Sequence, residues 1–210
     1  MKKIRVLVFG TTGTGKTSLC NNLTRGARPV DNGPKGVTSK THIYPIFTSG
    51  DAQIEIIDTA GLNEAIEGTV KPEEAIKQIM LLLQSAAEGF SILVHVMRMG
   101  RLTKDHEADY KFFVESMALS KIPSILAVTG CENEHPMSSW PERHRSSFER
   151  YAYGDIVATC FAQGGPLEEH YAPLRDQSRA SLVAAITAHA LPEPQLLYGA
   201  GTGTTYKKLI

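Results

Sequence analysis

The sequence feature that most constrains the fold is the stretch GTTGTGKT at residues 10–17. An apolar, β-branched run over residues 4–9 precedes it, and residues 16–23 can form a helix, so the order is strand, loop, helix. In this context the pattern G-x-x-x-x-G-K-[ST] is typical of a phosphate-binding loop, whose backbone N–H groups surround a polyphosphate at a helix N-terminus. A glycine-rich turn that happens to end in Lys-Thr is the alternative. The stretch predicts a site for the phosphates of a nucleotide.

Within this loop, Lys16 is expected to bridge the β- and γ-phosphates, and the Thr17 hydroxyl is expected to bind Mg²⁺. The residues that we expect to surround the phosphates are Thr12, Gly13, Thr14, Gly15, Lys16, Thr17 and Ser18.

The stretch IEIIDTAGL, residues 54–62, predicts a second phosphate-binding element. An expected strand ends at Asp58, which places a carboxylate near the metal, and Gly61 offers a backbone N–H to the γ-phosphate. Taken alone, the Asp-x-x-Gly spacing is a turn signature. Between the two elements lies a predicted loop, residues 26–41, from which either Thr38 or Thr41 could reach Mg²⁺.

The rest of the chain alternates strands with helices. Expected strands cover residues 43–47, 53–57, 91–97, 124–129 and 156–161, and expected helices cover 76–83, 104–119, 139–151 and 178–190. This alternation predicts an α/β fold in which a mainly parallel sheet lies between two helical layers. We expect one domain over residues 1–190 and a flexible tail rich in proline and glycine over residues 191–210.

Composition narrows the class of protein. Lys and Arg total 22, as do Asp and Glu, so there is no basic field of the kind that binds nucleic acid. Three cysteines without a Cys-x-x-Cys pair argue against a disulfide framework and favour a cytoplasmic location. No apolar stretch is long enough to suggest a signal peptide or a membrane span, so membrane attachment would need segments outside this chain.

Three stretches together resemble the P-loop G domain of the GIMAP or AIG-type immunity-associated family, a relative of the chloroplast Toc and septin GTPases. The resemblance covers roughly residues 5–161 and is carried by GTTGTGKTSLCNNL, IIDTAGL and GFSILVHVMRMGRLTKDHEADYKFF. In the last stretch Gly100, Arg101, Leu102 and Thr103 occupy the family's own box, which separates it from small Ras-like GTPases. The register of the resemblance favours Thr38 over Thr41 as the Mg²⁺ ligand.

The resemblance implies a switch that binds GTP and GDP. Such domains usually read guanine with Asn/Thr-Lys-x-Asp after a strand, and here TGCE stands at residues 129–132. Glu132 can accept hydrogen bonds from guanine, but Gly130 cannot cover the ring as a lysine stem does. A backbone N–H of Ala162 or Gln163 is expected to contact the guanine oxygen. If Glu132 is an ordinary loop acid, the chain could instead be an adenine-nucleotide kinase or ATPase, although no acceptor site is evident.

The expected chemistry is hydrolysis of GTP to GDP and phosphate, with Lys16, Thr38 and Arg101 as catalytic residues. Leu62 stands where Ras-like enzymes carry a water-orienting glutamine, so slow hydrolysis is predicted. The resemblance implies a homodimer that pairs face to face, with Arg101 reaching the partner's nucleotide; local pairing of Arg101 at the start of its own helix is the alternative. His106, one turn along, is predicted to lie at the surface. A GTP-binding assembly module with negligible turnover is the rival function.

Overall fold

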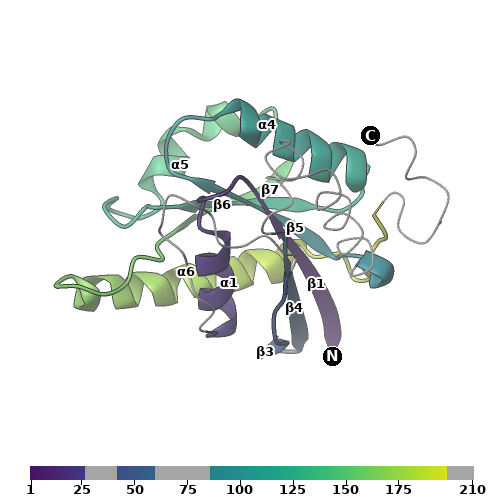
Figure 1. Cartoon of the computed structure of the whole chain (residues 1–210), viewed down its shortest axis with the longest axis horizontal. Coiled ribbons are helices and arrows are strands. Elements are labelled where there is room, and N and C mark those ends of the chain that lie inside the picture. The colour runs from purple at the N-terminus through teal and green to yellow at the C-terminus, as the bar shows by residue number, and fades with distance from the viewer. Residues whose placement is uncertain (27–41, 60–85, 198–210) are drawn as a thin grey trace, which may run out of the picture.

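The computed structural model describes residues 1–26, 42–59 and 86–197 of the 210-residue chain. Within them a mainly parallel sheet lies between two helical layers, as the sequence predicts (Figure 1). The strands are β1 Lys2–Phe9, β2 His42–Ile43, β3 Phe47–Ser49, β4 Ala52–Asp58, β5 Ile92–Arg98, β6 Ser124–Thr129 and β7 Tyr153–Thr159. The helical elements are α1 Lys16–Thr24, η1 Ala86–Glu88, α4 Lys104–Tyr110, η2 Lys111–Met117, α5 Ser139–Arg143, η3 Arg145–Phe148 and α6 Glu168–His189.

The sheet has the strand order β2-β4-β1-β5-β6-β7, and β3 pairs with β4. Strands β4, β1, β5, β6 and β7 are parallel, whereas β2 and β3 run antiparallel to β4. Parallel strands end at a common edge, so the loops that follow β1, β4, β5, β6 and β7 all emerge there. In open α/β sheets this edge is where ligands bind.

Alternation along β1 divides the core into two clusters. Val6 and Val8 belong to one cluster with Leu19 of α1, while Leu7 and Phe9 belong to the other. The first cluster also contains the buried face of α6, and the second contains the buried face of α4 and η2. Figure 1 accordingly shows α1 and α6 below the sheet and α4 and α5 above it. Covering both faces explains why the central strands are apolar without a polar side.

The strand predicted over residues 43–47 is interrupted. Its two ends form β2 and β3, and residues 44–46 lie outside both. Pro45 has no N–H to donate to a ladder, and this is the physical reason for the break. Across it, the Tyr44 N–H still donates to the Ile56 carbonyl at 2.9 Å, which keeps the segment on the sheet edge.

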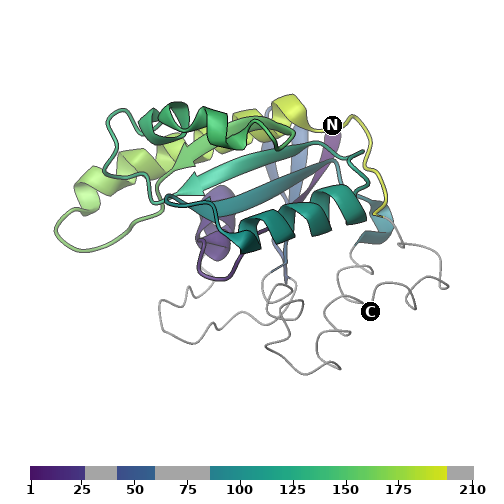
Figure 2. The same cartoon turned by 90° about the horizontal axis from the view of Figure 1, so that it is seen from above.

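The helices differ from the predicted bounds in three places. The last helix begins at Glu168, ten residues before the predicted start at Ser178, and contains Pro173. An interior proline costs a backbone hydrogen bond, so the sequence alone does not predict a helix that runs through Pro173. The helix predicted over 139–151 is a short α5 followed by the 3₁₀ turn η3. Phe148, at the end of η3, and Tyr151, beyond it, are both buried in the core. The helix predicted over 104–119 ends at residue 117, and η2 is its π-helical continuation, so that Figure 2 shows α4 and η2 as one rod.

Residues 191–197, the described part of the predicted tail, pack on the domain. The Phe90 and Gln195 backbones exchange two hydrogen bonds of 2.8 Å, and the Leu191 N–H donates to the Ser91 carbonyl at 2.9 Å. Leu197 is 1% exposed and joins the core cluster that contains Phe90. Figure 2 shows this yellow segment beside η1. The folded unit therefore extends past the boundary predicted at residue 190.

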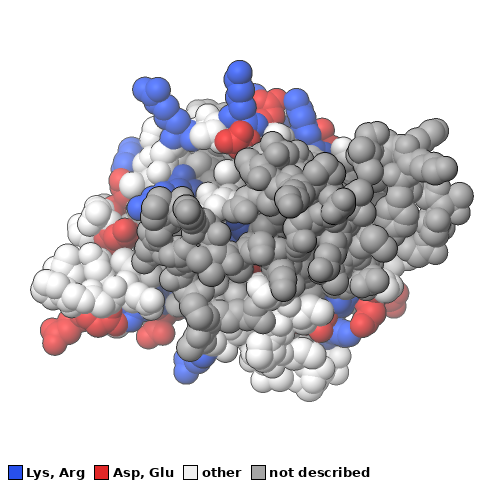
Figure 3. All heavy atoms as spheres, viewed as in Figure 1, with Lys and Arg blue, Asp and Glu red and all other residues white. Residues whose placement is uncertain are grey.

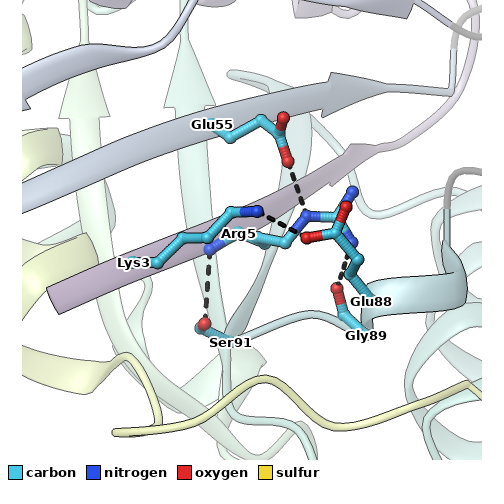
Figure 4. A network of polar contacts seen from close by, with 6 residues as sticks. All are labelled: Lys3, Arg5, Glu55, Glu88, Gly89 and Ser91. Atoms are coloured by element: carbon cyan, nitrogen blue, oxygen red, sulfur yellow. Dashed lines mark hydrogen bonds and ion pairs between the residues drawn. The ribbon is translucent and has the colours of Figure 1, made fainter.

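A buried arginine ties β1 to its neighbours at the edge opposite the ligand-binding loops (Figure 4). Arg5 is 3% exposed; its Nε lies 2.5 Å from Glu55 Oε2, and its Nη1 donates to the Gly89 carbonyl at 2.7 Å. The Arg5 N–H donates to Ser91 Oγ at 3.2 Å. A buried charge is tolerable only when paired and hydrogen-bonded in this way.

Of the helices in the described ranges, none is both long and apolar enough to cross a bilayer.

Candidate nucleotide-binding site

The predicted phosphate loop lies between β1 and α1, pressed against the ends of β5 and β6. Gly10 has φ +138°, and a Cβ there would lie 2.2 Å from the Val96 carbonyl oxygen. Only glycine fits at this position, because any side chain would collide with the β5 backbone. A Cβ on Gly15 would lie 3.3 Å from Thr129 Cγ2. The loop is therefore packed against the sheet on both sides of its turn.

Lys16 is bent back over its own loop. Its Nζ donates to the Gly10 carbonyl at 2.6 Å and to the Thr11 carbonyl at 2.9 Å, and the residue is 7% exposed. Thr14 Oγ1 donates to the same Thr11 carbonyl at 2.8 Å. The ammonium thus lies under the loop, against carbonyl oxygens that a more strongly accepting anion can replace.

Thr129, the first residue of the predicted base-reading motif, braces the phosphate loop. Its Oγ1 lies within hydrogen-bond distance of the Thr14 carbonyl, at 2.7 Å, and of the Met97 carbonyl, at 3.2 Å. Thr129 is the last residue of β6, so the brace couples the loop after β6 to the loop after β1. This contact supports the register in which TGCE follows a strand at the place of a base motif.

A cavity of about 1030 Å³ opens at this edge of the sheet. It joins the phosphate loop to the loops after β6 and β7 and to the facing sides of α1 and α6. Seven predicted residues line it, namely Gly13, Thr14, Gly15, Ser18, Glu132, Ala162 and Gln163. Its other polar lining includes Asn21, Asn22, Arg25, Arg98, Arg175 and Arg179, none of which the sequence motifs had indicated. Residues predicted to bind phosphate and base therefore share one cavity.

The remaining predicted residues do not line this cavity. Lys16 and Thr17 lie on its phosphate-loop side, within the first turn of α1, and Thr12 belongs to the same loop. Arg101 is exposed and is not part of the lining. Two more predicted residues, Thr38 and Gly61, lie outside the described ranges, as do Thr41, Leu62 and the predicted helix over residues 76–83.

Asp58 ends β4 beside the phosphate loop and is fully buried. Its strand pairs with β1 in the register Val8–Asp58, which brings it to the start of the loop. One buried carboxylate together with the Thr17 hydroxyl fits Mg²⁺, which prefers hard oxygen ligands and takes the rest from phosphates and water. In the ranges described, no three His, Cys, Asp or Glu side chains cluster as a protein-only metal site would require.

The loop after β7 is fastened to α6. Arg175 Nη1 donates to the Ala162 carbonyl at 2.7 Å, and Arg175 also pairs with Glu168. The Gly164 N–H donates to Glu168 Oε2 at 2.5 Å. The hydrogen bond from Arg175, followed by that from Gly164, lowers the pKa of the Glu168 carboxyl. These contacts hold the Ala162 and Gln163 backbones against the cavity, and no sequence pattern indicated them.

Beside the site, His106 contradicts its predicted surface position. It is 4% exposed and stacks on His95 with ring centroids 4.1 Å apart. The Tyr153 hydroxyl lies 2.7 Å from His95 Nδ1 and 3.2 Å from His106 Nε2. Burial lowers the pKa of His95 well below its usual value, and burial with the nearby Arg150 charge lowers the pKa of His106 to about 4. Both rings are therefore neutral packing groups near pH 7.

Comparison with known proteins decides the family. Residues 5–129, more than half of the chain, match the model of the family described as 50S ribosome-binding GTPase. The chain belongs to this GTPase family. This GTPase-family chain is 27% identical in sequence to GTPase Der of Chlamydia trachomatis serovar L2. The match extends over 158 residues, which cover 74% of the chain and 29% of Der.

Solved structures share the fold of this GTPase-family chain. Era in complex with MgGDPNP and nucleotides 1506–1542 of 16S ribosomal RNA is similar with a TM-score of 0.64 and 18% identity, over 96% of the chain and 61% of Era. The G domain of the T. maritima FeoB iron transporter is similar with a TM-score of 0.54 and 21% identity, over 89% of the chain and 98% of that domain. The chain spans less than a third of Der and under two thirds of Era. These matches establish a P-loop G domain and do not distinguish the immunity-associated branch within it.

Proposed function

We propose that this chain is a GTP-binding molecular switch that hydrolyses GTP to GDP and phosphate. The observation that carries the proposal is the single cavity that joins the phosphate loop to Glu132, Ala162 and Gln163. A nucleotide laid along this cavity would have its phosphates at the N-terminus of α1 and its base between the loops after β6 and β7. The GTPase family and the G-domain fold support this arrangement.

The phosphate end offers positive charge and backbone donors. Lys16 would exchange its two carbonyl acceptors for phosphate oxygens, since hydrogen bonds between charged groups are roughly twice as strong as neutral ones. The N–H groups of residues 12–18 would complete the phosphate site, with the α1 N-terminus adding a partial positive charge. Thr129 would keep the loop in place through its contact with the Thr14 carbonyl.

Bound Mg²⁺ would supply charge neutralisation between the phosphates. Thr17, Asp58 and Thr38 are the residues that we expect to hold it, with Thr38 on the segment outside the described ranges. The buried Asp58 carboxylate and the Thr17 hydroxyl match the oxygen donors that this ion takes.

Slow, dimer-dependent hydrolysis is the finer part of the proposal. Leu62 has no group that could orient water, so an arginine from a second copy would supply the charge stabilisation. Arg101 suits this role because it is exposed and, within the described residues, has no hydrogen bond or ion pair. The following helix is capped instead by Thr103, whose Oγ1 accepts from the His106 N–H at 3.2 Å. The AIG-type resemblance supports this face-to-face homodimer, and we propose membership of that branch together with the dimer.

A cytoplasmic location and the absence of a nucleic-acid partner complete the proposal. The three cysteines are free and buried, which suits a reducing compartment. Lys and Arg equal Asp and Glu in number, and Figure 3 shows both signs side by side on the described part of one face. The RNA in the Era structure is a ligand of Era.

The test is GTP turnover per molecule measured against protein concentration. We expect turnover to rise with protein concentration and Arg101→Ala to flatten this rise. The substitution should lower turnover by a factor on the order of 10³, the effect of removing an arginine finger that acts in trans. Arg145→Ala, another exposed arginine outside the cavity, is the matched control and should behave as the unaltered chain. Tight GTP binding with flat, near-zero turnover would favour the rival function, a nucleotide-loaded assembly module.

A further inference from the structure

The base end of the cavity has no side chain at position 130. In G domains of the type this sequence resembles, a lysine at this position covers the base, and here it is Gly130. The Gly130 backbone has φ +83°, in the left-handed region that a lysine adopts only with strain. Replacing the glycine by lysine would therefore place the new side chain on a strained backbone. If the base is covered on this side, the group must come from another element.

Arg98 lies in the space beside Gly130. A Cβ built on Gly130 would have Arg98 Cγ at 3.7 Å and Arg98 Nε at 3.9 Å as its nearest neighbours. Arg98 is the last residue of β5 and pairs in register with Thr129, so its backbone is fixed by the sheet. Arg98, Gly130 and Glu132 all line the same cavity. The arginine side chain thus passes the place where the lysine stem would begin.

The Arg98 guanidinium is available to a ligand. The residue is exposed and, among the described residues, takes part in no hydrogen bond or ion pair. Phe161 and Tyr171 also line the cavity, but each packs against a buried apolar cluster. A planar guanidinium stacks on aromatic rings and on nucleobases. Arg98 is therefore the group at this end best suited to contact the face of a base.

We propose that Arg98 covers the purine base of the bound nucleotide in place of the lysine that Gly130 replaces, an inference that rests on the proposed nucleotide-binding function. Glu132 reads the edge of the base, and Arg98 contacts its face. The two residues then have separable effects. Arg98 strengthens binding of any purine nucleotide, whereas Glu132 favours guanine.

The test compares GDP with tripolyphosphate, which has a polyphosphate chain one phosphate longer than that of GDP and no base. Their affinities are measured on the full chain by calorimetry for GDP and by competition with fluorescent GDP for tripolyphosphate. Arg98→Ala should raise the Kd of GDP about tenfold, the size expected for loss of one cation–base stacking contact, and should leave tripolyphosphate within about twofold. Arg98→Lys, which keeps an aliphatic stem and a charge but loses the planar guanidinium, should recover only part of the GDP affinity.

Arg145→Ala serves as the matched control, because it removes an exposed arginine that does not line the cavity. It should change neither affinity. An unchanged GDP affinity in Arg98→Ala would overturn the inference, and so would equal losses for GDP and tripolyphosphate, which would place Arg98 at the phosphates. If the unaltered chain bound no GDP, the proposed function itself would fall, and this inference with it.

Discussion

At the scale of single residues, the base end of the site differs from the usual Asn/Thr-Lys-x-Asp motif at residues 129–132, which are TGCE. Thr129 supplies the brace to the phosphate loop through its hydroxyl, and Gly130 leaves the space that Arg98 borders. Glu132 keeps a carboxylate at the position expected to read guanine and lines the cavity. We therefore expect base selectivity at this site to depend on the Glu132 carboxylate, whose neighbours in the sequence differ from the usual motif.

Glu132→Gln is expected to weaken GTP about 10- to 100-fold and ATP by less than about threefold. The reason is that guanine offers two N–H donors to a carboxylate, and a hydrogen bond to a charged group contributes about 1.5–3 kcal/mol. Titration calorimetry with both nucleotides measures the two affinities. Glu134→Gln is the control, since Glu134 pairs with Arg143 at 2.7 Å and does not line the cavity. Equal losses for GTP and ATP would remove Glu132 from base reading, and a preference of the unaltered chain for ATP would reopen the adenine-nucleotide alternative.

At the scale of elements, a layer of aromatic rings fastens α4 to the sheet. His95 comes from β5, His106 from α4 and Tyr153 from β7, and the Tyr153 hydroxyl lies within hydrogen-bond distance of both histidines. Burial raises the pKa of Tyr153 far above its usual value, so its hydroxyl keeps its proton. A neutral layer of this kind is stable only while both imidazoles stay uncharged.

We predict that acidification weakens this layer before the carboxyl groups titrate. The folded-state pKa of His106 is lowered to about 4, against about 6.5 in the unfolded chain, so the unfolded state binds more protons below pH 6.5. The contribution of His106 to the free energy of unfolding should thus be complete above about pH 7. It should fall by about 2 kcal/mol between pH 7.5 and pH 5, and His95 should lower the free energy of unfolding in the same direction. Urea unfolding at each pH measures it.

His106→Gln should reduce this pH dependence, whereas His144→Gln, at an exposed histidine, should leave it unchanged. A free energy of unfolding that stays constant from pH 7.5 to pH 5 would show that the two histidines are not held neutral in the folded protein.

At the scale of the whole molecule, the chain after α6 completes the fold. Residues 191–197 return to η1 and the start of β5, where the backbones of Phe90 and Gln195 pair and Leu197 enters the core. A Cβ on Gly89 would lie 2.6 Å from the Gln195 backbone, so the two segments are in close contact. The last described residues therefore belong to the domain.

A chain ended after Ala190 should be less stable than a chain ended after Leu197 and should unfold at a lower urea concentration. Without residues 191–197 the core loses the buried Leu197 side chain, and the Phe90 and Ser91 backbones lose three hydrogen bonds. Urea unfolding of the two chains measures the difference. Equal midpoints would support the boundary predicted at residue 190.

By itself the sequence determined the layered α/β fold and the phosphate loop, because strand and helix periodicity and the glycine spacing are local properties of the chain. It also placed Glu132, Ala162 and Gln163 after the strands that carry them to the cavity. Only the tertiary structure decided that His106 is buried, that α6 continues through Pro173 and that residues 191–197 are packed. The tertiary structure likewise showed that Arg98 lies beside Gly130, which follows the neighbouring strand β6. For His106, residues 191–197 and Arg98 the deciding contact joins segments that are separate in the chain, and no local pattern records such a contact.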